Sequence, residues 1–151
     1  MRILVVNNHA ILRNRLIRVV ADSVPGVSVD EAEDGQSALA MVRKARYALV
    51  LLDIFNPGKG GLEVLKKIKS RRPRVPVLTL SMHPEEEYAV RALRAGASGY
   101  VIKESAAEEL AEAVRKVLAG GLYVSPSLDG KLALGQEPDA DGAINNLSRW
   151  R

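Results

Sequence analysis

The stretch Ala48-Leu49-Val50-Leu51-Leu52-Asp53 decides the fold, because five apolar residues are followed directly by a carboxylate. Such a uniformly apolar run is typical of a strand in a parallel sheet, which helices cover on both faces. A charge at the end of that strand is unfavourably placed unless the fold uses it. We therefore expect a buried central strand that ends before Asp53, with this carboxylate as a candidate nucleophile. A helix cap or an ion pair is its alternative role.

Four further apolar runs lie on either side of this strand. They comprise residues 3–6, 27–29, 75–80 and 99–102. Each is followed by residues with helical spacing, the last by the stripe Leu110, Val114, Val117 and Leu118. Alternation of short strands with helices predicts an α/β fold, in which right-handed crossovers build a doubly wound, five-stranded parallel sheet with helices on both faces.

The composition fits one ordinary globular domain. The chain has 151 residues, 47% of them hydrophobic, and no cysteine, which excludes disulfides, zinc–thiolate sites and cysteine nucleophiles. The first apolar run is too short for a signal sequence or a membrane span, so a cytoplasmic location is expected. The formal charge of +4 indicates ordinary solubility more readily than nucleic-acid affinity, which also needs a basic patch.

The pattern divides the chain into two parts. Residues 1–124 carry the strand–helix alternation, whereas 125–151 are rich in Gly, Pro, Asp and Asn and are predicted to be a linker or tail. The chain ends at Leu147-Ser148-Arg149-Trp150-Arg151. Two interpretations of this hydrophobic ending remain: a tail that docks back on the domain, or the truncated start of a second domain.

Polar residues collect where the predicted strands end. In parallel sheets of this kind the functional crevice lies at the carboxyl ends of the strands. Those ends carry Asn7, Asn8, Asp53, Ser81 and Lys103. The lysine could pair with Asp53 or with an oxyanion on it, and the serine hydroxyl could bond a phosphoryl oxygen. Taken alone, Ser81 and Lys103 would be a capping serine and a surface lysine.

Four motifs resemble a response-regulator receiver domain, of the CheY-like kind. They are Asn7-Asn8-His9, Leu52 to Gly58, Leu80-Ser81-Met82-His83 and Gly96 to Lys103. The nearest likeness is to receivers that precede a LuxR-type helix-turn-helix DNA-binding domain, and it covers Arg2 to about Pro126. The resemblance implies the flavodoxin-like strand order 2-1-3-4-5.

The resemblance also implies roles for individual side chains. Asp53 would be the phosphoacceptor and would take a phosphoryl group from a sensor histidine kinase. Ser81 and Lys103 would complete the catalytic set by contacting the phosphoryl oxygens. Ser81 and Tyr100 would form the switch, in which the hydroxyl turns toward the phosphoryl group and the aromatic ring rotates inward.

The metal site departs from the family pattern. Receivers of this kind bind Mg²⁺ through two acids after the first strand, the phosphoacceptor and a backbone carbonyl, which match Asn7, Asn8, Asp53 and the backbone oxygen of Phe55. Here both acids are amides. Each unit charge about 4 Å away is worth about 4 kcal/mol at an effective dielectric of about 20, so we expect weak or absent Mg²⁺ binding and poor phosphorylation. The amides are either natural or replacements of aspartates that silence the site.

Two functions follow as hypotheses. The first is a receiver of a two-component response regulator, a phosphorelay module and not a turnover enzyme, that controls transcription through a DNA-binding domain absent from these residues. The second is a stand-alone, phosphorylation-independent protein-interaction domain. Under either hypothesis a homodimer is a further expectation, and no membrane contact is expected. A phosphoaspartate hydrolase would need a second acid near Asp53, which Ile54 and Phe55 do not supply.

Overall fold

The computed structural model describes residues 1–54, 60–81, 86–102 and 106–126. Strands and helices alternate along these residues, as the apolar runs predict. The strands are β1 (Arg2–Val6), β2 (Ser28–Ala32), β3 (Leu49–Asp53), β4 (Val77–Ser81), β5 (Gly99–Ile102) and β6 (Tyr123–Val124). The helices are α1 (Ala10–Ser23), α2 (Gly35–Lys44), α3 (Gly61–Arg71), α4 (Glu86–Arg94) and α5 (Ala106–Leu118).

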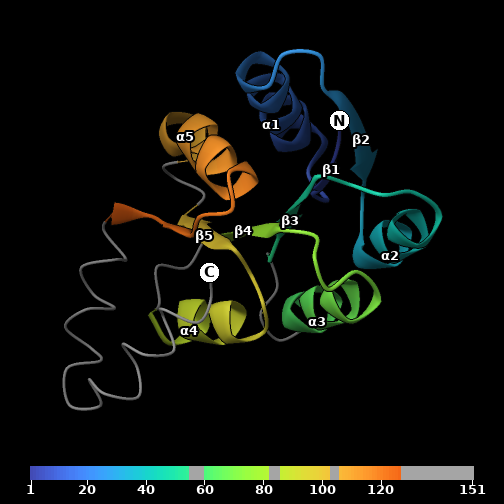
Figure 1. Cartoon of the computed structure of the whole chain (residues 1–151), viewed down its shortest axis with the longest axis vertical. Coiled ribbons are helices and arrows are strands. Elements are labelled where there is room, and N and C mark those ends of the chain that lie inside the picture. Colours follow the sequence, from blue (N-terminus) through green and yellow to red (C-terminus); the bar gives the residue numbers. More distant parts are fainter. Residues whose placement is uncertain (55–59, 82–85, 103–105, 127–151) are drawn as a thin grey trace.

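All strand pairs are parallel, and their order in the sheet is β2-β1-β3-β4-β5-β6 (Figure 1). The order of the first five strands is the predicted one. The prediction of five strands was wrong, because β6 adds a sixth at the edge. Strand β6 has only two residues, and the surrounding run Leu122-Tyr123-Val124 is shorter than the four to eight apolar residues by which periodicity indicates a strand.

Strand β6 pairs with β5 through Tyr123 opposite Gly99 and Val124 opposite Tyr100. A β-carbon on Gly99 would lie 2.6 Å from the carbonyl oxygen of Tyr123, so glycine is needed for this approach. The chain stays attached one residue further, since the backbone N–H of Ser125 donates to the carbonyl of Tyr100 at 3.0 Å. Ser125 is itself buried.

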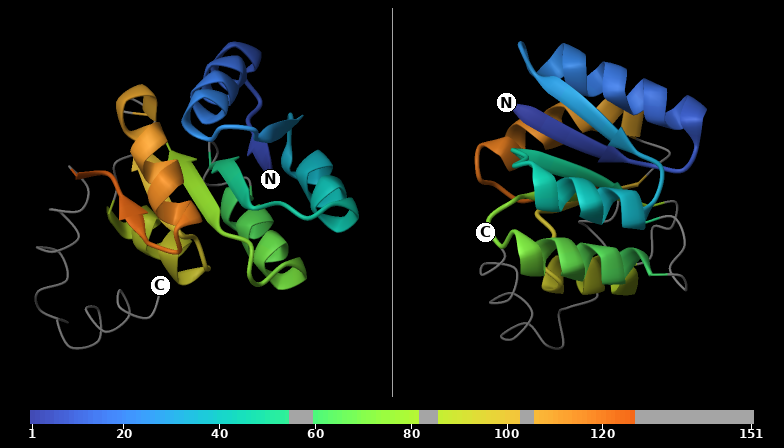
Figure 2. Two further views of the ribbon diagram at one scale, coloured as in Figure 1. Left: turned by 45° about the horizontal axis from the view of Figure 1, so that its top comes forward. Right: turned by 90° about the vertical axis from the view of Figure 1, so that its right-hand side faces the viewer.

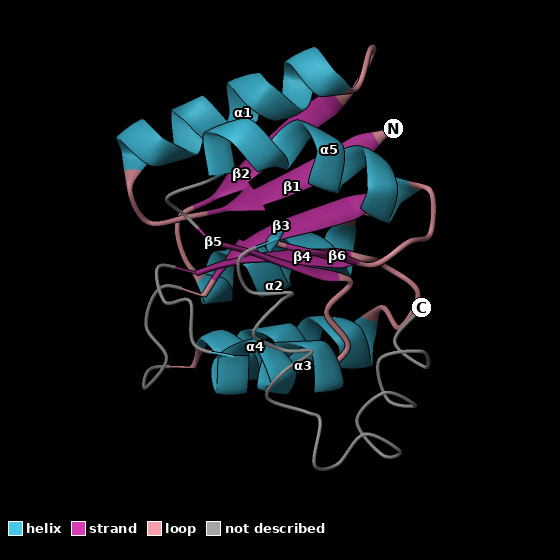
Figure 3. Cartoon of the chain, turned by 90° about the vertical axis from the view of Figure 1, so that its left-hand side faces the viewer, coloured by secondary structure: helices cyan, strands magenta, loops and turns pink. Residues whose placement is uncertain are grey.

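The sheet is the middle layer of three. Helices α1 and α5 cover one face, and α2, α3 and α4 cover the other (Figures 2 and 3). Successive residues of a strand point to opposite faces, so Ile3 and Val5 belong to the core beneath α1 and α5, whereas Leu4 and Val6 belong to the other core. The continuous apolar strands are explained by this double burial.

Two elements differ in detail from the sequence expectation. Strand β2 continues to Ala32, beyond the run at 27–29. Helix α4, whose buried face the sequence does not indicate, turns Ala89, Ala92 and Leu93 into the core. Among the described helices, none is long and apolar enough to cross a membrane.

Candidate functional site

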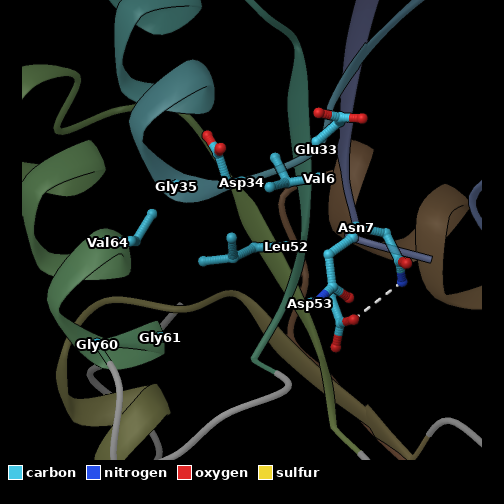
Figure 4. Close-up of a pocket in the computed structure, with 11 residues that line it drawn as sticks. Val6, Asn7, Glu33, Asp34, Gly35, Leu52, Asp53, Gly60, Gly61 and Val64 are labelled. Carbon is cyan, nitrogen blue, oxygen red and sulfur yellow. Dashed lines mark hydrogen bonds between the residues drawn. The ribbon is translucent and has the colours of Figure 1, made fainter. Parts of the chain in front are cut away.

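Two neighbouring strands end beside the candidate phosphoacceptor. Val6, the last residue of β1, lies in register with Leu52 of β3, so Asn7 and Asp53 continue adjacent strands at the same edge of the sheet. A cavity of about 220 Å³ opens there. Its lining comprises Val6, Asn7, Asn8, Glu33, Asp34, Gly35, Leu52, Asp53, Gly60, Gly61 and Val64 (Figure 4).

Asn7 is held by four hydrogen bonds and is only 1% exposed. Its side-chain Nδ2 donates to Oδ2 of Asp53 at 2.9 Å, and its Oδ1 accepts from the backbone N–H of His9 at 2.7 Å. Its backbone N–H donates to the carbonyl of Ala32 at 3.0 Å, and its own carbonyl accepts from Nη1 of Arg13 at 2.8 Å. The asparagine therefore belongs to a closed network in which its NH₂ group faces the carboxylate.

The orientation of the Asn7 amide follows from its two neighbours. Rotating the amide by half a turn would set its NH₂ group against the N–H of His9 and its oxygen against the carboxylate of Asp53. Both contacts would then be repulsive, since amide orientation is fixed by the hydrogen-bond partners around it. The Asn7 side chain thus supplies both the donor to Asp53 and the acceptor for the backbone N–H of His9.

The side chains that the structure describes at this edge offer few of the ligands that Mg²⁺ prefers. Mg²⁺ takes oxygen ligands, usually carboxylates, whereas Asn7 presents NH₂ toward Asp53 and already uses its oxygen. Asn8 is exposed and contributes only a neutral amide. Within the part of the chain that the structure describes, no group of three or more His, Cys, Asp or Glu side chains is placed to hold a metal ion.

Two acids from the loop after β2, Glu33 and Asp34, line the same cavity, but their carboxylates do not join that of Asp53. Asp34 is the N-cap of α2, and its Oδ1 accepts from the backbone N–H of Ser37 at 2.8 Å. These hydrogen bonds from Ser37 lower the pKa of Asp34 below its usual value. Figure 4 shows the carboxylates of Glu33 and Asp34 turned away from that of Asp53. The carboxylate of Asp34 is therefore engaged in capping α2.

Sequence reasoning missed Arg13, which supports the site from α1. Its Nη1 donates to the carbonyl of Asn7, and its Nε donates to Oε1 of Glu31 at 2.7 Å. The Arg13 side chain is 12% exposed, against 51% for Glu31. No sequence motif identifies this arginine, because its contact is to a main-chain atom.

Two glycines bring the start of α3 against the cavity. Gly60 caps the helix with φ +96°, a left-handed conformation that favours glycine. A β-carbon on the next residue, Gly61, would lie 2.6 Å from Cγ2 of Ile54, so a larger residue would push the helix away from β3.

The other predicted site residues fall into two groups. Ser81 ends β4 and Tyr100 lies in β5, and both are fully buried, in a sheet where Asp53 and Ser81 close adjacent strands. Lys103 and Phe55 lie outside the described residues. The structure therefore brings Asn7 to Asp53 and places Asn8 at the same cavity.

Comparison with known proteins identifies the family. The model of the response regulator receiver domain matches residues 3–115. Response regulator GacA of Pseudomonas aeruginosa is 34% identical over 149 residues, which are 97% of this chain and 70% of that protein. A crystal structure of a LuxR-family two-component response regulator from Aurantimonas sp. SI85-9A1 has a TM-score of 0.82 and 34% identity, covering 89% of this chain and 96% of the other. A CheY-like receiver from Methanospirillum hungatei has a TM-score of 0.71 and 26% identity, covering 79% and 94%. With its sheet order, its strand-end aspartate and these matches, the chain belongs to the response regulator receiver domain family.

Proposed function

We propose that this domain is the receiver of a LuxR-type response regulator in which Asp53 is the phosphoacceptor and the magnesium site is impaired. The family and the relatedness to GacA support a role in two-component signalling and not in metabolic turnover. The position of Asp53 at the end of a central buried strand supports its role as acceptor. The stand-alone interaction domain is not favoured, since the relatives are response regulators and transcriptional regulators.

The proposal of an impaired magnesium site rests on the hydrogen bond from Asn7 to Asp53. Receivers in the family bind Mg²⁺ close to the acceptor carboxylate, where the cation offsets negative charge. Here the amide N–H supplies the positive end of a dipole to Oδ2 of Asp53. A hydrogen bond to a charged group is worth about 1.5–3 kcal/mol, and a cation would have to displace it.

Weak cation binding has a direct chemical consequence. A phosphoryl group that moves to Asp53 carries negative charge on its oxygens, and phosphoryl transfer depends mainly on positioning and on neutralising that charge. The two amides provide dipoles but no anionic ligands for a divalent ion. We expect phosphorylation to be slow, with the resting network of Asn7 favoured.

A sensor histidine kinase would donate the phosphoryl group, and Ser81 and Lys103 would bind its oxygens. Burial of Tyr100 beside Ser81's strand supports its role as the switch residue. Residues 125–151 would lead to a DNA-binding effector domain, through which response regulators control transcription, and a homodimer would form the active species.

Acetyl phosphate tests the function and the impairment together. The chain and its Asn7→Asp/Asn8→Asp variant are exposed to acetyl phosphate with Mg²⁺, and the adduct is measured by intact mass. The double variant should gain a phosphoryl group at least about tenfold faster, which corresponds to about 1.4 kcal/mol in barrier. An Asp53→Ala version of the double variant should gain none. Rapid labelling of the unmodified chain would contradict the impaired site, and labelling that survives Asp53→Ala would contradict the acceptor.

A further inference from the structure

Positive charge is concentrated in one segment of the chain. Residues 35–81 hold ten of the 22 Lys and Arg residues and only two of the 18 Asp and Glu residues, a formal charge of +8. The remaining residues are therefore net negative, although the whole chain carries +4. The modest net charge of the chain is therefore the sum of one strongly positive segment and a negative remainder.

The fold gathers these cations at one end of two neighbouring helices. Helices α2 and α3 lie side by side on one face of the sheet (Figure 2), and cations occupy the last turn of each. The loops that follow the helices add further cations and lead into β3 and β4. We define the basic face by five exposed side chains: Arg43, Arg46, Lys67, Arg71 and Arg74.

The basic face contains two adjoining hollows. One, of about 350 Å³, is lined by Arg43, Lys67 and Arg71 together with Leu39 and Ser70. The other, of about 360 Å³, is lined by Arg46, Tyr47 and residues 71–75. Arg71 lines both, so the two hollows adjoin at this residue near the ends of α2 and α3, and cations line each of them.

These cations are not neutralised within the described structure. The ion pairs of the described residues are Arg2 with Asp30 and Arg13 with Glu31, and neither involves the basic face. Lys67 and Arg71 stand four residues apart on α3, where like charges repel by some tenths of a kcal/mol. The helix dipole stabilises cations in the last turn of a helix, but Arg46 and Arg74 lie beyond the helices. The helix dipoles therefore do not account for the positive charges of Arg46 and Arg74.

The side chains of the basic face indicate an extended polyanion as its partner. Among the described residues, the large hydrophobic side chains that are exposed are Met1 and Ile11, and neither lies on α2 or α3. The face thus presents no large exposed hydrophobic side chain of the kind that anchors a membrane or protein interface. Tyr47 is half-buried and its hydroxyl donates to Asp30 at 2.7 Å, so the face offers no exposed aromatic ring for stacking unpaired bases. A row of guanidinium groups fits the phosphates of a duplex.

We propose that the basic face binds the phosphate backbone of duplex DNA without reading its sequence. The face lies at the edge of the sheet where β3 and β4 begin, whereas Asp53 and Ser81 end these strands. Five residues of strand span about 16 Å, so a duplex on this face leaves the Asp53 cavity open. The receiver would thereby add electrostatic affinity to a DNA-binding domain on the same chain. The proposal does not depend on phosphorylation.

Fluorescence anisotropy of a labelled random-sequence duplex tests the proposal on the 151-residue chain. We expect Kd between about 1 and 100 µM at about 50 mM salt, with log K falling linearly against log salt. The variant Arg46→Gln/Arg71→Gln/Arg74→Gln should bind at least about tenfold more weakly, with a salt slope lower by about 2–3. Far-UV circular dichroism checks that the variants remain folded.

A matched variant separates this face from net charge. Arg18→Gln/Arg115→Gln/Lys116→Gln removes the same charge from exposed positions of α1 and α5 and should change Kd by less than about threefold. Equal weakening by both triple variants would overturn the proposal. Tighter binding to a poly-glutamate peptide or to vesicles rich in anionic lipid than to the duplex would overturn it as well.

Discussion

Asn7 donates a hydrogen bond of 2.9 Å from Nδ2 to Oδ2 of Asp53, across the ends of two adjacent strands. The oxygen of the same amide accepts from the N–H of His9 at 2.7 Å, so the side chain cannot turn without losing both bonds. The carboxylate of Asp53 is thus stabilised by an amide donor of the protein itself.

Introducing acids at positions 7 and 8 should give the chain a response to magnesium. We expect Asn7→Asp/Asn8→Asp to be less stable than the unmodified chain in EDTA, because three carboxylates then lie together. With Mg²⁺ at about 100 times Kd, binding adds about 2.7 kcal/mol, which raises Tm by about 5–10 °C for a chain of this size. The unmodified chain should shift by less than about 1 °C. NaCl at equal ionic strength is the control, and an equal Mg²⁺ shift in both proteins would contradict the prediction.

The proximity of Asn7 and Asp53 could be predicted from the sequence. Each residue follows an apolar run, and parallel strands bring their carboxyl ends to one edge. The position of Ser81 at the end of β4 follows from the same reasoning, although Ser81 and Asp53 are the last residues of their strands and not the first after them. The order of the first five strands was instead implied by the resemblance to receiver domains, because apolar runs alone do not fix which strands are neighbours.

Contacts made through the backbone could not be predicted. Arg13 reaches the carbonyl of Asn7, and any residue would present that carbonyl. Strand β6 exists because Gly99 lacks a side chain, which admits the backbone of Tyr123 next to it. The basic face required the fold, since Arg46 and Arg71 are far apart in sequence and meet only where α2 and α3 pack together.

Arg13 should matter more through its bond to a carbonyl than through its ion pair. We expect Arg13→Ala to lower the free energy of unfolding by about 1–3 kcal/mol, because the carbonyl of buried Asn7 loses a charged donor. Glu31→Gln should cost no more than about 1 kcal/mol, since exposed ion pairs contribute little. Urea unfolding measures both. Equal losses for the two variants would show that the ion pair is what matters.

Ser125 should anchor the end of the described chain to β5. Its Oγ accepts from the N–H of Ile102 at 3.0 Å, and both residues are buried. Ser125→Ala leaves this N–H without its acceptor, so we expect a loss of about 1–3 kcal/mol in urea unfolding. The exposed Ser28 provides the control, and Ser28→Ala should change stability by less than about 0.5 kcal/mol. No difference between the variants would exclude an anchoring role.

Alkaline pH should destabilise the fold through Tyr47. Burial and the hydrogen bond to Asp30 raise the pKa of this phenol from 10.0 to about 12. A phenol with a raised pKa keeps its proton longer in the folded state, so the unfolded state binds fewer protons above pH 10 and stability falls as pH rises. The contribution is complete below pH 10 and is lost between 10 and about 12. Burial and the nearby Glu109 also raise the pKa of Tyr123. Urea unfolding at successive pH values should therefore decline less steeply for Tyr47→Phe, and least for Tyr47→Phe/Tyr123→Phe, whereas an unchanged decline in the double variant would assign the alkaline loss to lysine deprotonation.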